Sequence, residues 1–263
     1  MYTQNLPEPD EVLHTASGYK ICHYKTVSST NHLAKEIAKK SNEEKTVILA
    51  ENQTSGKGRL GRHWVSPKGG IWLSIILRPK ISPREALKLT FIASSAVAKT
   101  IQNTFGLEAQ VKWPNDVFVN RKKISGILTE ATTQESLVEF VVLGVGINAN
   151  VNLNSFPNDL RRTVTSLKHE LGREVKKRPL IKTLLQNFEH NYKRLQRGMW
   201  HTLLQEWKSM AMFLGEQVEI ASFGENFAGK ALDVDQDGAL IIRLDNGELR
   251  RVITGDVTVK KQR

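Results

Sequence analysis

A loop rich in glycine and arginine, set between two apolar segments, constrains the fold of this 263-residue chain most strongly. The loop spans 56–62 (GKGRLGR), after a short strand predicted over 46–50 (TVILA) and before a second predicted over 71–77 (IWLSIIL). Pro67 and the Gly69–Gly70 pair are incompatible with a helix between loop and second strand. The segment therefore joins strand to strand.

The same loop contains the G-x-G-x-x-G pattern of dinucleotide-binding folds. In those folds a helix opens within the pattern, and an acidic residue about 20 residues later binds the ribose. No helix can form here, and no acidic residue stands between Arg62 and Glu85. We therefore reject the Rossmann interpretation.

Glycines in a strand-to-strand loop let the backbone approach a ligand with its N–H groups pointing inward. Lys57, Arg59 and Arg62 add three cations, and arginine can bind a phosphate or carboxylate through two parallel hydrogen bonds. The loop is suited to an anion such as a nucleotide phosphate. On its own it is equally compatible with a flexible basic surface loop.

Periodic apolar positions predict an α+β fold, with helical and strand patterns mixed through the first 213 residues. Residues 1–18 are expected to be a poorly ordered or edge-lying lead-in. Further strands are predicted over 19–25, 109–112, 117–119, 123–130 and 137–144, and helices after Ser28–Asn31, from Ser82 to Gly106, over 180–195 and over 199–212. Residues 51–63 are expected to form a loop.

The character of the chain changes from Gly215 onward. Short alternating segments are joined by Asp237-Gly238 and Asn246-Gly247, which are strong hairpin signals. We expect a small antiparallel barrel or sandwich here, and hence two domains, over 1–213 and 214–263.

Two further segments combine chemistry-bearing residues with turns or glycines. Lys112-Trp113-Pro114-Asn115-Asp116 lies between two predicted strands, where it is either a hairpin turn or part of a nucleotide site. Lys123 leads into an apolar strand interrupted by Gly126, which indicates a bulge or a close approach to a ligand. A lone lysine at such a place is more often exposed than in a cleft.

The strand that ends at Asn148 carries Gly144 and Gly146 on one face. A sheet face bare of side chains is either the floor of a pocket for a flat ligand or a place of tight packing against a helix. The strand alone does not separate these alternatives.

Composition narrows the class of protein. The net charge of +11 favours an anionic partner or simply a lysine-rich surface, and a basic nucleic-acid-binding module is one rival interpretation. Cys22 is the single cysteine, which excludes an intrachain disulfide. No apolar run reaches the ~20 residues of a membrane span, and the polar start lacks a signal peptide. We expect a cytoplasmic protein with no membrane partner.

Taken together, these segments resemble the biotin protein ligases. The matching segments, in the family's order, are S-S-T-N at 28–31, Gln53 with G-K-G-R-L-G-R at 56–62, Trp64, K-W-P-N-D at 112–116, K-I-S-G-I-L at 123–128 and G-V-G-I-N at 144–148. Lipoate-attaching relatives share the fold, but they lack the combination of the glycine–arginine loop and the K-W-P-N-D motif. A lipoate or octanoate ligase or transferase of the same fold is the alternative.

The resemblance implies a mixed β-sheet with helices, related to class II aminoacyl-tRNA synthetases, and a C-terminal Src-homology-3-like β-barrel. It implies that biotin is activated by ATP, with magnesium, to biotinyl-5′-AMP. The biotin is then transferred to a lysine of a biotin carboxyl carrier domain, the expected protein partner.

The resemblance also implies a role for each matching residue. Lys123 and Arg59 are the expected catalytic residues. Biotin is expected to contact Ser29, Thr30, Asn31, Gln53, Gly56, Lys57, Gly58, Arg59, Lys123 and Gly126. ATP is expected to contact Arg59, Arg62, Trp64 and Asn148, and to bring magnesium with it. Lys112, Trp113, Asn115 and Asp116 are expected to form a structural turn near the site.

The chain departs from the family pattern at two positions. Lys57 stands where arginine is common, so the charge is kept but two-pronged binding is lost. Lys260 is aligned with a nucleotide-contacting arginine.

About 18 residues precede the first strand, too few for the winged helix-turn-helix of some members. We therefore expect no DNA-binding function; a homodimer is possible, as in other members.

Overall fold

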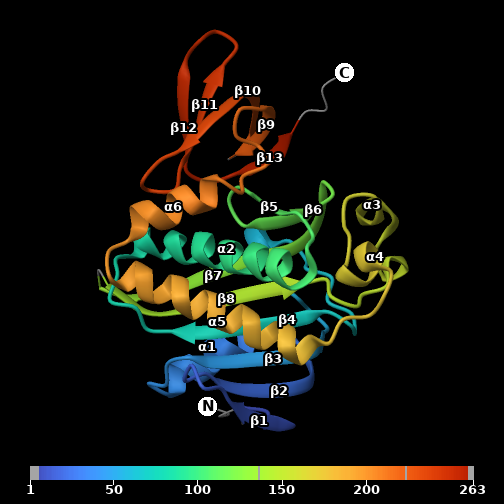
Figure 1. The fold of residues 1–263 in the computed structure, drawn as a ribbon. Helices are drawn as coiled ribbons and strands as arrows, with labels where there is room; N and C mark the ends of the chain where they lie inside the picture. The colour runs from blue at the N-terminus through green and yellow to red at the C-terminus, as the bar shows by residue number, and fades with distance from the viewer. Residues whose placement is uncertain (1–5, 136, 223, 260–263) are drawn as a thin grey trace.

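An eight-stranded mixed sheet forms the larger part of the computed structural model, which describes residues 6–135, 137–222 and 224–259. The strand order is β1-β2-β3-β4-β8-β7-β6-β5 (Figure 1). The strands are β1 (Glu11–His14), β2 (Lys20–Val27), β3 (Thr46–Gln53), β4 (Ile71–Leu77), β5 (Ala109–Lys112), β6 (Asp116–Val119), β7 (Lys122–Gln134) and β8 (Leu137–Ile147). The β2–β3 ladder is parallel, and the other ladders are antiparallel.

Helices cover both faces of this sheet (Figure 1). The long helices are α1 (Thr30–Lys40), α2 (Ala86–Phe105), α5 (Lys177–Gln196) and α6 (Trp200–Lys208). Helix α1 packs on β3, β4 and β8, whereas α2 packs on β7 and supports α5 and α6. The short helices α3 (Asn158–Arg161) and α4 (Leu167–Leu171) follow β8, and three 3-10 turns span Arg59–Gly61, Pro83–Glu85 and Leu153–Ser155.

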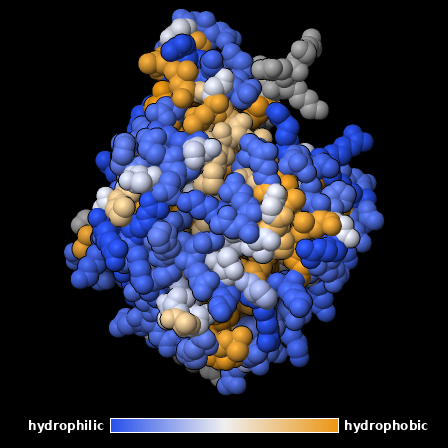
Figure 2. Space-filling view, in the orientation of Figure 1, coloured by the Kyte–Doolittle hydropathy of each residue, from blue (hydrophilic) through white to orange (hydrophobic). Residues whose placement is uncertain are grey.

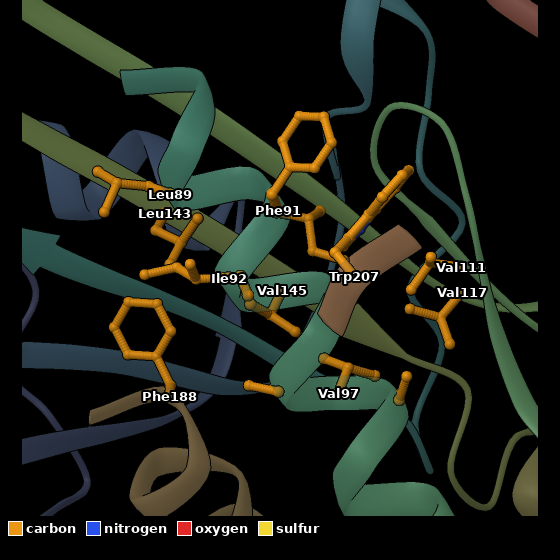
Figure 3. Packing of buried hydrophobic residues seen from close by; sticks show 14 of the residues in the cluster. Leu89, Phe91, Ile92, Val97, Val111, Val117, Leu143, Val145, Phe188 and Trp207 are labelled. Atoms are coloured by element: carbon orange, nitrogen blue, oxygen red, sulfur yellow. The ribbon is translucent and has the colours of Figure 1, made fainter. Parts of the chain in front are cut away.

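Strand alternation divides the buried side chains between the two faces. On β8, Phe140 and Val142 pack with α1, while Val141 and Leu143 belong to the larger core beneath α2. Figure 3 shows Leu143 and Val145 directed at the α2 side chains Leu89 and Ile92. The positions 144 and 146 that follow on the α1 face of β8 carry no side chain.

Local sequence signals account for the helix ends. Ser29 caps α1, since its hydroxyl accepts the backbone N–H of His32. Ser82 and Glu85 form a reciprocal capping box before α2. Gly106 ends α2 with φ of 68°, a left-handed conformation that glycine adopts without steric cost. The predicted long helix and its stop at Gly106 are confirmed, but its predicted first turn forms a separate 3-10 turn over Pro83–Glu85.

Several element boundaries differ from the sequence prediction: β7 runs on to Gln134, β8 runs on to Ile147, and α6 ends at Lys208 and not at 212. Strand β3 continues to Gln53, because the paired register with β2 runs on to Val27 opposite Gln53. The loop therefore begins three residues later than expected. Helices α3 and α4, which have four and five residues, were not predicted. The lead-in expected at the N-terminus contains β1, which pairs antiparallel with β2 at the sheet edge.

The C-terminal segment forms a second, five-stranded antiparallel sheet in the order β12-β11-β10-β9-β13. Its strands are β9 (Gln217–Ser222), β10 (Glu225–Val234), β11 (Leu240–Leu244), β12 (Leu249–Val252) and β13 (Asp256–Val259). Gly238 and Gly247 have φ of 82° and 87°, as the predicted hairpin turns require. The ladders of the described residues place β12 and β13 at opposite edges of this antiparallel sheet, which agrees with the small antiparallel β domain that the sequence predicts; closure into a barrel is not among these ladders.

One continuous hydrophobic core connects the two sheets. The Trp207 ring of α6 lies 4.6 Å from Phe91 of α2 and 6.1 Å from Phe213, between ring centroids. The Trp113 indole donates to the Gly238 carbonyl at 2.9 Å. Figure 2 shows a mainly hydrophilic outer face over α2, α5 and α6, with a hydrophobic patch on the second sheet. No helix within the described ranges is long and apolar enough to cross a membrane.

Candidate functional site

A cavity of about 260 Å³ opens on the α1 face of the large sheet. Its walls come from the start of α1, the glycine–arginine loop, the middle of β7 and β8, and the segment that contains α3. Residues singled out from the sequence that line it are Ser29, Thr30, Asn31, Gln53, Lys57, Gly58, Arg59, Arg62, Trp64, Asn115, Asp116, Lys123, Gly126, Gly144, Gly146 and Asn148. Segments far apart in the chain therefore meet at one place.

Glycines form the floor of the cavity. Gly126 pairs across the ladder with Gly146, so two neighbouring strands are bare on the same face. A Cβ atom at Gly146 would lie 2.6 Å from the Trp64 Nε1, and one at Gly144 would lie 2.2 Å from Asn31 Oδ1. The sequence left two alternatives for this bare face, tight packing or the floor of a pocket, and both apply. Trp64 and the first turn of α1 pack on it, and the rest of it forms the floor of the cavity.

One end of the cavity is polar and neutral. Gln53 Oε1 accepts the backbone N–H of Thr30 at 2.7 Å and its hydroxyl at 3.0 Å. Gln53 Nε2 donates to Ser66 Oγ at 2.8 Å. The buried Ser74 hydroxyl lies 2.7 Å from Thr30 Oγ1 and 2.6 Å from Asn31 Oδ1. Such a set holds a ligand that offers both hydrogen-bond donors and acceptors.

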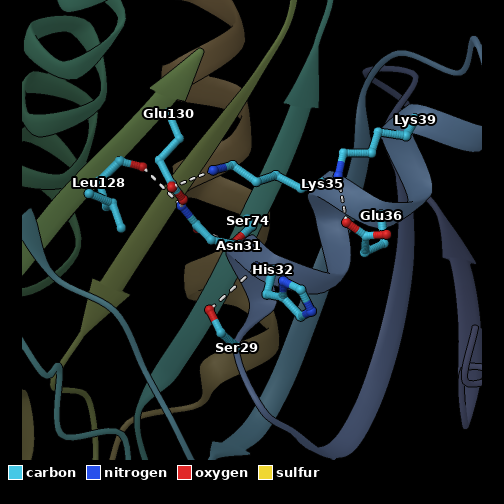
Figure 4. Close-up of polar contacts among 9 residues, drawn as sticks. All are labelled: Ser29, Asn31, His32, Lys35, Glu36, Lys39, Ser74, Leu128 and Glu130. Carbon is cyan, nitrogen blue, oxygen red and sulfur yellow. Dashed lines mark hydrogen bonds and ion pairs between the residues drawn. The ribbon is translucent and has the colours of Figure 1, made fainter. Parts of the chain in front are cut away.

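Behind this polar end, Asn31 is tied to an ion pair (Figure 4). Its Nδ2 donates to Glu130 Oε2 at 2.7 Å, and Lys35 Nζ lies 2.5 Å from Glu130 Oε1. Burial opposes ionisation of Glu130, but the hydrogen bonds from Lys35 and Asn31 hold the pKa of its carboxyl below the ordinary value of 4.5. Glu130 is therefore a carboxylate near neutral pH.

The opposite end of the cavity is cationic. Lys123 Nζ lies 2.7 Å from Asp116 Oδ1 and 5.1 Å from the centroid of the Trp64 ring. Lys123 lines the cavity, although an exposed position was the commoner expectation for a lone lysine. Its ammonium group faces the cavity, where it can meet an anionic ligand, and it forms an ion pair with Asp116.

Arg59 joins the loop to the rest of the site. Its guanidinium donates to Asn115 Oδ1 at 3.1 Å, to the Gly255 carbonyl at 3.3 Å and to Thr254 Oγ1 at 3.1 Å. Burial lowers the pKa of the Arg59 guanidinium below its usual value, and the nearby charges of Asp256 and Asp116 oppose that shift. Arg62 forms an ion pair with Asp256. The loop therefore contacts the turn between β12 and β13.

Three polar atoms of cavity-lining residues are buried without a hydrogen-bond partner among the described residues; one of them, Asp116 Oδ1, is ion-paired with Lys123. Asn148 donates its Nδ2 to the Thr165 carbonyl at 2.9 Å, which leaves its Oδ1 unpartnered. The Trp64 Nε1 is also unpartnered. Buried polar atoms are nearly always satisfied, so a ligand that donates to Asn148 suits this position.

Three residues named from the sequence do not line the cavity. Gly56 packs beneath the loop, where a Cβ atom would lie 2.3 Å from the Trp64 carbonyl oxygen. The Nζ atom of Lys112 lies 4.7 Å from the centroid of the Phe118 ring, and burial lowers the pKa of this ammonium group. Trp113 is buried under Gly238. Asn115 and Asp116 of the same motif do reach the cavity.

Other contributors were missed. Ser74 is the one polar residue of its strand (IWLSIIL), a signal that could have been read. Glu130, Asp256, Phe156 and Leu160 carried no local signal, because each resembles an ordinary surface or core residue. Lys260 lies outside the described residues. Within the described part of the chain, no group of three or more His, Cys, Asp or Glu is placed to hold a metal ion.

Comparisons with known proteins identify a family. Residues 24–148 match the model of the biotin/lipoate A/B protein ligase family, and residues 213–260 match the biotin protein ligase C-terminal domain. The bifunctional ligase/repressor BirA of Bacillus subtilis is 34% identical over 91% of this chain and 74% of its own length. The biotin–[acetyl-CoA-carboxylase] ligase of Mycobacterium tuberculosis is 29% identical, covering 94% of this chain and 92% of its own.

A solved structure shares the fold. The biotin protein ligase from Aquifex aeolicus, in complex with biotin and ATP, has a TM-score of 0.78 at 24% identity, and the match covers 92% of this chain and 99% of that one. The two family models, the sequence relatives and this fold agree with one another. The chain belongs to the biotin protein ligase family.

Proposed function

We propose that this chain activates biotin with ATP to biotinyl-5′-AMP and transfers the biotin to a lysine of a biotin carboxyl carrier domain. One observation carries the proposal: a single cavity joins a neutral hydrogen-bonding end at Thr30 to a cationic end at Lys123, across a flat glycine floor. Biotin has the matching form, with a planar ureido ring at one end and a carboxylate at the other.

In the first step, a carboxylate oxygen of biotin attacks the α-phosphorus of ATP, and pyrophosphate leaves. Ser29, Thr30, Asn31 and Gln53 hold the ureido ring, which fixes the reach of the acyl chain. Lys123 and Arg59 stand at the cationic end, where negative charge from carboxylate and phosphate must crowd together. Preorganised cations and correct placement supply the catalysis, and no protein nucleophile is needed.

The nucleotide binds beside Trp64, Arg62 and Asn148. The unpartnered Asn148 Oδ1 accepts an N–H from the base, and Arg62 leaves Asp256 for a phosphate. Magnesium enters with ATP as part of that substrate. Asp116 is the carboxylate nearest Lys123 within the cavity wall and fits a supporting contact to a magnesium-bound nucleotide.

In the second step, the neutral amine of the acceptor lysine attacks the biotinyl carbonyl carbon, and AMP leaves with the anhydride oxygen. Lys57, Gly58 and Arg59 close over the mixed anhydride until the acceptor arrives. Closing the loop excludes water, which would otherwise hydrolyse the intermediate.

The test is incubation of the chain with ATP and labelled biotin, followed by detection of biotinyl-AMP, pyrophosphate and labelled carrier domain. Label on the intermediate and on the carrier supports the proposal. Adenylation of lipoate or octanoate in place of biotin would instead support the alternative ligase, and ATP-independent transfer of such an acyl group from an activated donor would support the transferase. Absence of any acyl-adenylate would refute both ligase functions.

We further propose that residues 1–213 form the catalytic domain and 214–263 the small C-terminal domain. The second sheet starting at Gln217 supports this division, although the core runs through both. ATP-dependent modification of a carboxylase fits a cytoplasmic enzyme. Two predictions remain to be tested. A gel-shift assay tests whether the chain fails to bind DNA, and analytical sedimentation tests whether it forms a homodimer.

A further inference from the structure

We propose that Glu130, held by Lys35, is a positioning residue that sets the direction of the hydrogen-bond chain against which biotin's ureido ring binds. The inference rests on the proposed function. Neither residue lines the cavity, and both act through Asn31 (Figure 4).

The carboxylate determines which way the Asn31 side-chain amide faces. A carboxylate only accepts hydrogen bonds, so the Asn31 group 2.7 Å from Glu130 Oε2 has to be its NH₂. The same Nδ2 also approaches the Leu128 carbonyl at 3.4 Å, a second acceptor. Asn31 Oδ1 therefore faces Ser74. With the amide reversed, two acceptors would oppose its oxygen.

This orientation determines the protons of two hydroxyl groups. Asn31 Oδ1 can only accept, so the single proton of Ser74 is donated to it across 2.6 Å. The Thr30 hydroxyl donates its own proton to Gln53 Oε1 at 3.0 Å, inside the protein, and Ser74 Oγ, 2.7 Å away, has its proton directed to Asn31. Thr30 therefore presents only lone pairs to the cavity. It is an acceptor for a ring N–H.

Lys35 keeps the chain in this state. Its Nζ binds the other carboxylate oxygen, Glu130 Oε1, at 2.5 Å, and the side chains of the pair are only 32% and 25% exposed. Lys57 adds a weaker favourable charge from the loop. If the carboxylate were removed, Asn31 could turn. Ser74 would then donate to Thr30, and one Thr30 lone pair would be lost to the ligand.

The test compares Glu130→Leu, Lys35→Met and Lys35→Arg with the unaltered chain. Lys39→Met is the matched control, since Lys39 lies one turn along α1 and pairs with Glu36 at 2.8 Å. Calorimetry gives the Kd for biotin. Pyrophosphate release gives kcat and the KM values for biotin and ATP, and thermal melting reports folding.

We expect Glu130→Leu to raise the biotin Kd and KM at least about ten-fold, as loss of a hydrogen bond to a charged group predicts. The KM for ATP and kcat should stay within about two-fold. Lys35→Met should shift biotin binding the same way by a smaller factor, Lys35→Arg should restore it, and Lys39→Met should match the unaltered chain.

Unchanged biotin binding in Glu130→Leu and Lys35→Met would overturn the inference while the proposed function stands. A parallel loss in kcat and both KM values would also overturn it, because that is the signature of a merely structural role. If Glu130→Leu does not fold, Lys35→Met decides, since it keeps the carboxylate. Failure of the unaltered chain to bind biotin would refute the proposed function itself.

Discussion

Replacing Lys123 by methionine tests the cationic end of the site. Methionine keeps an apolar stem beside Trp64 but removes the ammonium group, which lies 2.7 Å from Asp116 and 5.1 Å from the Trp64 ring centroid. The substitution therefore removes one charge from the cavity wall with little change in volume.

The expected effect follows from Coulomb's law. Two unit charges about 4 Å apart interact by about 4 kcal/mol at an effective dielectric constant of about 20, a value suited to a partly buried site. Each 1.36 kcal/mol corresponds to a factor of ten, so kcat/KM for biotin should fall by about 10³. Stability should change little: a partly exposed ion pair contributes about 1 kcal/mol, or roughly 2–4 °C in Tm.

The assay is biotin-dependent pyrophosphate release under saturating ATP, with biotinyl-AMP measured directly in the same samples. Lys122→Met is the matched control, because Lys122 is the neighbouring residue of β7 and does not line the cavity. A loss below ten-fold in Lys123→Met, in a folded protein, would refute the electrostatic reasoning. An equal loss in Lys122→Met would show that general charge, not position, matters.

Three further predictions concern the floor, the loop and the helical layer. Gly144→Ala places a Cβ atom 2.2 Å from Asn31 Oδ1. The free energy of unfolding measured with urea should therefore fall by about 1–3 kcal/mol, and the KM for biotin should rise. Unchanged values would contradict the packing argument. Arg59→Gln should release biotinyl-AMP into an ultrafiltrate, whereas full retention would count against loop closure. Glu206 bonds Arg194 and Lys99, and its pKa is lowered to about 2 from 4.5. A lowered carboxyl pKa stabilises the fold above pH 4.5, and this is lost as pH falls toward 2. Glu206→Gln should therefore lower the free energy of unfolding by about 1–2 kcal/mol at pH 7, allowing for solvent screening, and should not change it near pH 2. Thermal melts at a series of pH values measure this difference. A difference that does not vary with pH would contradict the role of the Glu206 carboxylate.

Much of the fold could be predicted because its elements are long and periodic. The stripe that ends at Gly106 and the alternating strands on either side of the glycine–arginine loop are examples. Helices α3 and α4 are too short to show a period. The pairing of β13 with β9 joins segments about 40 residues apart, and no local pattern encodes it.

The candidate site divides in the same way. Lys123 and Arg59 could be named because they stand in segments with distinctive spacing. Glu130 could not be, since an acidic residue late in a strand resembles a solvated one, and only the register that places it opposite Val142 brings it under α1. Gly144 and Gly146 were recognised, but what covers them is decided by chain segments more than 80 residues away.

The contacts of Arg59 with Thr254 and Gly255 bear on how the protein is made. Thr254 and Gly255 follow Arg59 by 195 and 196 positions, so they are synthesised long after the loop. A nascent chain can pair β2 through β8 before the second sheet exists, and the loop obtains this anchor only once the segment between β12 and β13 has emerged. Until then Trp207 and Phe213 lack the strands that cover them, which makes the unfinished chain a natural substrate for chaperones.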